Sequence, residues 1–167
     1  FYANSDAHRV SPRLDEVVVP VEWVEEKRTR EKTRDTLTRA RAAFEAERAV
    51  MIFPAGRLAR RLPGGELSDP PWQASAMSLA RKYHAPVVPM HLVGPWSTMF
   101  HFFDRFSQEL RDITLFHELL NKRGQAFQLI VGHPIAPEAL DLDAAKATLA
   151  VKAFVEQKLP KDPDGAF

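Results

Sequence analysis

The sequence predicts an α/β domain in which a mostly parallel sheet is flanked by helices. Three observations indicate this fold class. Short apolar runs of strand length alternate with longer segments whose apolar residues recur every three or four positions. No segment of the chain is repeated. The chain has 167 residues, about the length of one domain, so we expect residues 1–167 to form a single domain.

Composition and charge exclude several classes of protein. With 45% hydrophobic and 27% charged residues, the chain has the balance of a folded globular protein. Its 23 basic and 22 acidic side chains leave a net charge of +1, which argues against a nucleic acid partner and requires any anion site to be local. The lack of cysteine excludes disulfides and thiolate metal ligands and favours the cytoplasm. No apolar run approaches the roughly 18 residues that a membrane-spanning helix needs.

The first third of the chain predicts a strand–helix–strand unit. Residues 1–4 read as the end of a buried strand, so we expect the domain to lack its N-terminal part. The valine-rich residues 16–23 predict a strand that Pro20 places at an edge or at a bulge. Residues 27–48 predict a surface helix with a narrow apolar stripe, and residues 49–53 (AVMIF) a strand covered on both faces. This order is typical of a parallel crossover.

The rest of the chain continues the alternation. Residues 54–69 contain two prolines, three glycines and no sustained period, which predicts a loop. Loops beyond about 12–15 residues are uncommon and usually functional. The elements expected after it are a helix over residues 72–83, a strand over 86–93, a helix in the second half of 96–106, a helix over 110–120, a strand over 126–131 and a helix over 143–159. Five aromatic residues crowd into residues 96–106, where they predict either core or a surface that contacts a bilayer or an acyl chain.

The long loop is the best candidate for a site. It follows the predicted strand at residues 49–53, and parallel sheets bind ligands beyond the carboxyl ends of their strands. Gly56 allows the backbone to approach a ligand closely, and planar guanidinium groups match phosphate or carboxylate. The arginines of the loop are Arg57, Arg60 and Arg61. We therefore expect a site for an anionic ligand; the alternative is a basic, solvent-facing loop that Glu66 and Asp69 partly neutralise.

Residues 52–57 (IFPAGR) resemble the F-P-E-G-T-R block of the glycerolipid acyltransferase family, which includes the 1-acylglycerol-3-phosphate acyltransferases. The neighbouring pieces agree in order. Residues 75–82 resemble the helix with a small-residue face that follows this block, and residues 85–89 (APVVP) resemble the family's V-P-(I/V)-x-P strand. Residues 109–124 look like a bacterial branch, the hemolysin-like or lyso-ornithine-lipid acyltransferases. The resemblance covers about residues 1–135.

The resemblance implies a glycerolipid acyltransferase-like fold and an O-acyltransferase of phospholipid or membrane-lipid synthesis. In such an enzyme an acyl chain passes from acyl-CoA or acyl carrier protein, as co-substrate, to a hydroxyl of a lysolipid or glycerol-phosphate-type acceptor, without a further cofactor. It also implies a cytoplasmic location, peripheral to the inner face of the membrane. The substrate-binding residues that it implies are Phe53, Pro54, Gly56, Arg57 and Arg60. Arg57 is the first candidate for gripping an anionic group of the acceptor or of the donor, and Arg60 the second.

The chain departs from the family pattern at two points. Ala55 stands where the family has glutamate, so a polar contact from that position to the acceptor's glycerol or phosphate is not carried over. The catalytic H-x-x-x-x-D is absent, because none of the six histidines has an aspartate five residues later. Family order places that motif before Phe1. We therefore identify no catalytic residue and no metal ligand within the chain.

Other interpretations remain open at this stage. The chain could be a member of the same fold that binds lipid or an anionic ligand without turnover, and an upstream H-x-x-x-x-D would favour the enzyme instead. An unrelated α/β phosphate-binding enzyme is a third reading, but no glycine-rich phosphate loop supports it. His8 lies seven residues before Asp15, a spacing that does not match the family. His117 lacks the second histidine four residues later that zinc proteases need, so it reads as structural.

Overall fold

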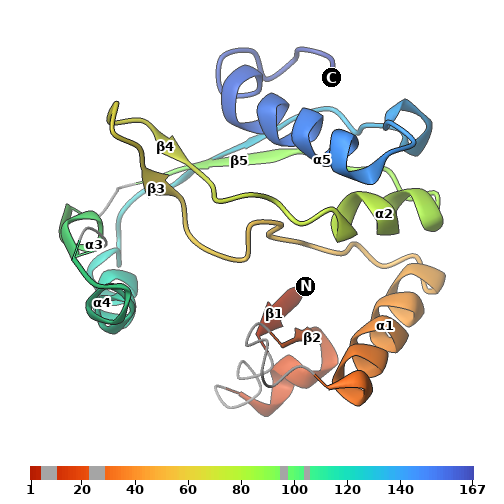
Figure 1. Cartoon of the computed structure of the whole chain (residues 1–167), viewed down its shortest axis with the longest axis horizontal. Helices are drawn as coiled ribbons and strands as arrows, with labels where there is room; N and C mark the ends of the chain where they lie inside the picture. Colours follow the sequence, from red (N-terminus) through yellow and green to blue (C-terminus); the bar gives the residue numbers. More distant parts are fainter. Residues whose placement is uncertain (5–10, 23–28, 95–97, 104–105) are drawn as a thin grey trace.

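The computed structural model describes residues 1–4, 11–22, 29–94, 98–103 and 106–167 (Figure 1). Its helices are α1 (Arg30–Glu45), α2 (Ser75–Lys82), α3 (Thr98–Phe103), α4 (Gln108–Asn121) and α5 (Ala144–Ala153). Its strands are β1 (Tyr2–Asn4), β2 (Val19–Val21), β3 (Arg60–Arg61), β4 (Leu67–Ser68), β5 (Met90–Val93) and β6 (Gln128–Val131). Two 3₁₀ turns, η2 (Pro12–Glu16) and η4 (Pro137–Ala139), and a π-helical turn, η5 (Phe154–Lys158), complete the list. In this part of the chain no helix has the length and apolar character to cross a membrane.

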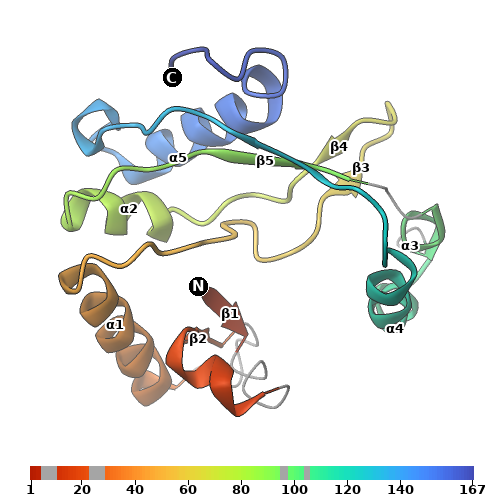
Figure 2. The same cartoon turned by 180° about the vertical axis from the view of Figure 1, so that it is seen from behind.

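The strands of this mixed α/β structure form three small sheets rather than one mostly parallel sheet. β1 pairs with β2 in parallel, whereas β3 with β4 and β5 with β6 are antiparallel. The expectation of a mostly parallel sheet is therefore wrong for the described residues. Between β5 and β6 the chain passes through both α3 and α4, which lie at the same end of the β5–β6 ribbon (Figures 1 and 2). A helical hairpin returns the chain to the end it left, so β6 runs back along β5.

The strand predicted over residues 49–53 does not form. Its backbone contact with a strand is a single hydrogen bond from the Tyr2 amide to the Met51 carbonyl, 3.0 Å long. Met51 and Phe53 are exposed, whereas Ile52 packs against the core. The segment is therefore covered on one face only. An apolar run predicts that side chains are buried, but it does not supply a strand partner.

Other predicted bounds differ as well. The strands predicted over residues 86–93 and 126–131 begin only at Met90 and Gln128. The strand expected over residues 16–23 is shortened to β2, because Glu16 belongs to η2. Pro20 does lie within β2, opposite Ala3 of β1. The loop predicted over residues 54–69 contains the short β3–β4 hairpin, which the arginines and glycines of the sequence did not reveal.

All five predicted helices form, and local capping explains where several of them begin. The hydroxyl of Thr29 accepts a hydrogen bond from the Lys32 amide at the start of α1, and Ser107 does the same for Leu110 at α4. At α5 the Asp143 carboxylate accepts from the amides of Ala145 and Lys146, at 2.8 and 3.4 Å.

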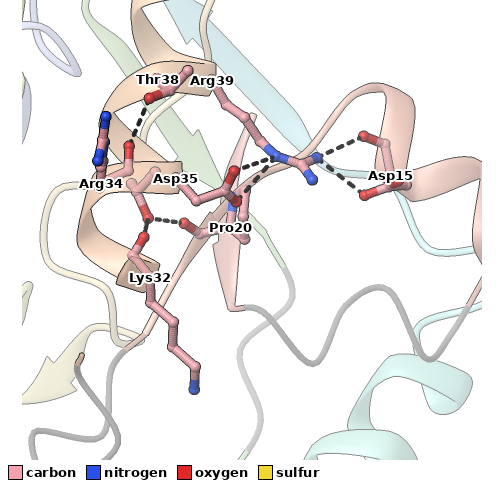
Figure 3. A network of polar contacts seen from close by, with 8 residues as sticks. Asp15, Pro20, Lys32, Arg34, Asp35, Thr38 and Arg39 are labelled. Carbon is pink, nitrogen blue, oxygen red and sulfur yellow. Dashed lines mark hydrogen bonds and ion pairs between the residues drawn. The ribbon is translucent and has the colours of Figure 1, made fainter. Parts of the chain in front are cut away.

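A polar network fixes α1 on the N-terminal strands (Figure 3). Arg39 of α1 bridges Asp35 on the same helix and Asp15 on η2, with nitrogen–oxygen distances of 3.2 and 3.0 Å. The hydrogen bond with Asp15 is the main cause that raises the pKa of Arg39. Thr36 donates its hydroxyl hydrogen bond to the carbonyl of Pro20 in β2. Exposed ion pairs contribute little stability, so this network orients the helix more than it stabilises it.

The main core lies between α2, the β5–β6 ribbon and the last helix, α5 with η5 (Figure 1). Its buried members are Ala76, Met77, Ala80, Ile130, Ile135, Leu140, Ala147, Val151, Phe154, Val155 and Leu159. Ile130 of the ribbon faces this core, whereas the opposite face of the ribbon is exposed. That exposed face carries two cross-strand pairs, Met90 with Val131 and Leu92 with Leu129.

Candidate functional site

The segment that carries the F-P-A-G-R residues folds as a tight turn. The Gly56 amide donates to the Phe53 carbonyl at 3.0 Å, and Gly56 has φ +61°, a left-handed conformation that favours glycine. The Pro54 carbonyl accepts from the Gln73 amide at 3.0 Å, which ties the turn to the segment that enters α2. The turn is therefore stabilised by a hydrogen bond within it and by a second one to the segment that precedes α2. Phe53 in this turn is 64% exposed to solvent.

Arg57 follows the turn and is exposed. In the described part of the chain, no hydrogen bond or ion pair engages its guanidinium. Exposed apolar side chains stand on both sides of it in sequence, namely Phe53 and Leu58. Arg57 thus combines a cation that is open to a ligand with apolar neighbours.

Arg60 and Arg61 are adjacent in β3 and differ in environment. Successive side chains of a strand point to opposite faces, so these two arginines serve different surfaces. Arg61 is exposed and donates from Nη1 to the Gly65 carbonyl at 2.9 Å, within its own hairpin. Arg60 is half-buried, and its Nε and Nη2 are enclosed without a hydrogen-bond partner among the described residues. Arg61 is engaged by the hairpin turn, while Arg60 retains two unused donors.

The state of Arg60 is energetically unusual. A buried donor without an acceptor costs about 1–3 kcal/mol, and more when the group is charged. Native proteins retain such groups chiefly where a ligand, an ion or water completes them. Among the described residues Arg60 forms no ion pair with a carboxylate, so an anion that reaches it would meet two unpaired nitrogens, Nε and Nη2. This is the strongest electrostatic reason to place an anion site at this loop.

The returning strand of the hairpin is fastened to the last helix. Glu156 of η5 accepts a hydrogen bond from the Asp69 amide at 2.8 Å, just after β4. Lys152 of α5 pairs with Glu156 at 2.6 Å and donates to the Ser68 hydroxyl at 3.2 Å. Asp69 in turn accepts from the indole of Trp72 at 3.0 Å. The arginine hairpin is therefore anchored by residues that lie more than eighty positions later in the sequence.

Two histidines of the described residues lie near a carboxylate, and neither pair is buried. His84 lies 3.8 Å from Glu138 and His133 lies 4.0 Å from Asp164, and all four side chains are largely exposed. His117 is exposed on α4, while its neighbour Glu118 pairs with Lys122 at 3.0 Å. His8 lies outside the described residues. Within the described residues, no group of histidine, aspartate and glutamate side chains is placed to hold a metal ion.

Two concavities lie away from the loop. Their volumes are about 400 and 350 Å³. Both are formed by η5 and the C-terminal tail, with Phe154 and Lys158 in each, and α5 contributes to the second only. None of the arginines of the loop lines either one. These concavities adjoin the C-terminal tail, whereas the guanidinium without a partner among the described residues, that of Arg60, lies at the loop. We therefore place the candidate site at the loop.

The comparisons with known proteins identify the family. The sequence model of the family described as "Acyltransferase" matches residues 1–93, more than half of the 167-residue chain. The chain belongs to this acyltransferase family. The matched region contains the turn, the arginine hairpin, α2 and β5, and it stops before α3. The resemblance noted from the sequence is thus confirmed at the level of the family.

The chain is also similar to a curated protein. The chain is 29% identical over 120 residues to a "Lyso-glycine lipid O-acyltransferase" of Phocaeicola vulgatus. The alignment covers 68% of this chain and 43% of the relative. The chain thus spans less than half the length of that protein. No solved structure matches the chain.

The predicted substrate-binding residues fall into two places in the structure. Phe53, Pro54 and Gly56 share the tight turn, and Arg57 follows it directly. Arg60 lies on β3 of the hairpin. Sequence reasoning missed the contact of Ser68 and Asp69 with the last helix, although the four-residue spacing of Lys152 and Glu156 is typical of a helical ion pair.

Proposed function

We propose that this chain is the acceptor-binding part of an O-acyltransferase that acylates a lysolipid or a glycerol-phosphate-type acceptor in membrane-lipid synthesis. The single observation that carries the proposal is Arg60, whose Nε and Nη2 are enclosed without a partner in the loop that the acyltransferase family model covers. The finer fold, an arrangement like that of the glycerolipid acyltransferases, belongs to the same proposal.

The proposed reaction is transfer from a thioester to an alcohol. The acceptor hydroxyl loses its proton to a general base while its oxygen attacks the thioester carbonyl carbon of acyl-CoA or acyl carrier protein. A carbon–oxygen bond forms and the carbon–sulfur bond breaks. The released thiolate takes up a proton, so the products are an ester and a thiol. In the family pattern the base is a histidine oriented by an aspartate, in an H-x-x-x-x-D motif that these 167 residues do not contain.

The residues of this chain are proposed to bind and orient the acceptor. Arg57 and Arg60 hold its anionic headgroup by hydrogen bonds, since guanidinium groups match carboxylate and phosphate oxygens. Exposed Phe53 and Leu58 offer apolar surface beside these cations. A lysolipid has this same pairing of a polar head with an apolar chain.

Between the two acceptor classes, a lysolipid is the better supported. Ala55 lacks the carboxylate that the family's glutamate would direct to a glycerol-phosphate acceptor. The relative in Phocaeicola vulgatus is named for a lyso-glycine lipid. The shared chemistry is an anionic headgroup, either carboxylate or phosphate. The second candidate function, a member that binds lipid without turnover, is favoured by the absence of H-x-x-x-x-D from these 167 residues.

The experiment that tests the function is mass spectrometry of lipids from cells that lack the gene and cells that regain it. We expect one class of diacylated lipid to disappear while its lysolipid accumulates, and both to return to normal on complementation. A lipid profile that is the same in all three strains, together with no acyl transfer by the purified complete protein to a lyso-glycine lipid or to 1-acylglycerol-3-phosphate, would support the non-catalytic alternative.

We further propose peripheral contact with the inner face of the membrane through the α3–α4 hairpin, which stands at one end of the structure (Figures 1 and 2). The aromatic cluster of residues 96–106 divides here: Phe100 is buried, whereas Phe102 and Phe106 are exposed and pack on each other at 5.1 Å. Trp96 lies outside the described residues. On α4, exposed Leu110, Ile113 and Leu120 share one face by their helical spacing.

Replacing Phe106 and Ile113 together by serine is expected to weaken sedimentation with phosphatidylcholine–phosphatidylglycerol vesicles by about tenfold or more, because two large apolar side chains are removed from the lipid contact. Their present exposures are 71% and 74%. Leu149→Ser, at a 68% exposed leucine on α5, is the control and should leave vesicle binding unchanged. Equal binding by all three proteins would refute contact through this hairpin.

A further inference from the structure

We infer that Glu156, together with Lys152, is a positioning residue that sets the orientation of Arg60 through the β3–β4 hairpin. The inference deepens the proposed function and rests on it, because it assigns the acceptor site a support from the last helix. Neither residue lies within residues 1–93, the part of the chain that the family model matches.

Glu156, Lys152 and Ser68 each contact the other two through their side chains. Glu156 Oε1 accepts from the Asp69 amide at 2.8 Å and from the Ser68 hydroxyl at 3.3 Å. Glu156 Oε2 pairs with Lys152 Nζ at 2.6 Å, and the same Nζ donates to the Ser68 hydroxyl at 3.2 Å. The side chains of Lys152 and Glu156 are 16% and 18% exposed. An ion pair this sheltered is less screened than a surface pair, and charge-assisted hydrogen bonds are the stronger kind.

The hairpin register connects this set to Arg60. Ser68 lies directly opposite Arg60 in the β3–β4 ladder. Residues that face each other across an antiparallel pair place their side chains on the same face. The serine that Lys152 and Glu156 hold is therefore the cross-strand neighbour of the arginine with two unused buried donors.

The hairpin needs such an anchor. It has only two residue pairs, Arg60 with Ser68 and Arg61 with Leu67, and short isolated hairpins are marginally stable in water. Its turn is stabilised from within by Arg61 and Gly65. The contacts of Glu156 and Lys152 secure the opposite end, at the base of β4. Glu156 itself lies in the π-helical turn η5, a feature often found at functional sites.

The expected consequence is a change in acceptor binding rather than in chemistry. In the complete protein, Glu156→Ala removes all the contacts of this carboxylate and should raise the KM for the acceptor about tenfold, with kcat within about twofold of wild type. Glu156→Gln keeps a neutral acceptor for the Asp69 amide and should recover part of the loss. The assay uses acyl-CoA with a lyso-glycine lipid in one arm and 1-acylglycerol-3-phosphate in the other, which distinguishes a carboxylate headgroup from a phosphate.

A matched control separates positioning from general stability. Glu118 pairs with Lys122 on α4 at 3.0 Å, with side-chain exposures of 11% and 18%, so Glu118→Ala removes a similarly sheltered pair on another helix. It should lower the melting temperature by a similar amount and leave KM unchanged. Ser68→Ala removes only the hydroxyl and should raise KM in the same direction by less, which keeps the test valid if Glu156→Ala folds poorly.

A double-mutant cycle with Arg60→Ala tests whether Glu156 affects acceptor binding through Arg60. If Glu156 acts through Arg60, Glu156→Ala should raise KM much less in the Arg60→Ala background than in wild type. Equal increases in both backgrounds, or no KM change in Glu156→Ala while Arg60→Ala raises KM, would overturn the inference. No KM change in Arg60→Ala itself would instead count against the proposed anion site.

Discussion

Arg57→Ala is expected to lower kcat/KM for acyl transfer by about one to two orders of magnitude, which corresponds to the roughly 1.5–3 kcal/mol typical of a hydrogen bond to a charged group. Arg57 is exposed and has no partner among the described residues, so its removal breaks no contact there that holds the fold. The whole loss should therefore appear in activity, with the unfolding transition unchanged. The measurement is steady-state kinetics of the complete protein with the acceptor varied.

Arg61→Ala is the matched control for this prediction. Arg61 is a nearby exposed arginine of the same loop, but its guanidinium is bonded to Gly65 within the hairpin. It should change kcat/KM much less than Arg57→Ala does. An Arg57→Ala protein with unaltered kcat/KM would remove Arg57 from the site, and equal losses in both variants would show that only the net charge of the loop matters.

The sequence predicted the helices well because their signals are local. The apolar spacing within residues 143–159 matches α5 and η5, and capping residues such as Thr29 and Asp143 lie beside the helices they start. Strands were predicted less well because a ladder needs a partner elsewhere in the chain. Residues 49–53 have the composition of a buried strand, yet they make one backbone bond to Tyr2 and expose Met51 and Phe53.

At the candidate site, too, the local features could be predicted from the sequence and the long-range contacts could not. The turn at Phe53–Gly56 could be inferred from proline and glycine, because both restrict the backbone locally. The different environments of Arg60 and Arg61 could not be inferred. They follow from the β3–β4 hairpin, and no pattern within residues 54–69 indicates that pairing. The link from Ser68 to Glu156 spans 88 positions and is visible only in the folded chain. Family resemblance pointed to Arg57, and the structure added the reason to single out Arg60.

The last prediction concerns the core that supports this site. Leu159→Ala should lower the free energy of unfolding by about 2–5 kcal/mol, because the lost methyl and methylene groups leave a cavity. Leu159 is 0% exposed and directly follows η5, the turn that carries Glu156. Urea-induced unfolding measures the change. Leu149→Ala, at the exposed leucine of α5, should stay within about 0.5 kcal/mol of wild type.

Gly132 supplies an independent check on the packing at Leu159. A Cβ added at Gly132 would lie 2.8 Å from Leu159 Cδ1 and 3.1 Å from Pro89 Cγ, so Gly132→Ala should destabilise the wild-type protein by about 1–3 kcal/mol through overpacking. In the Leu159→Ala background the closer clash is gone and the added methyl group enters the cavity. Gly132→Ala should then cost markedly less, and part of the Leu159→Ala loss should be recovered. Strictly additive losses would mean that the added methyl group and the Leu159 side chain do not occupy the same space. The packing of Leu159 against Gly132 would then be wrong.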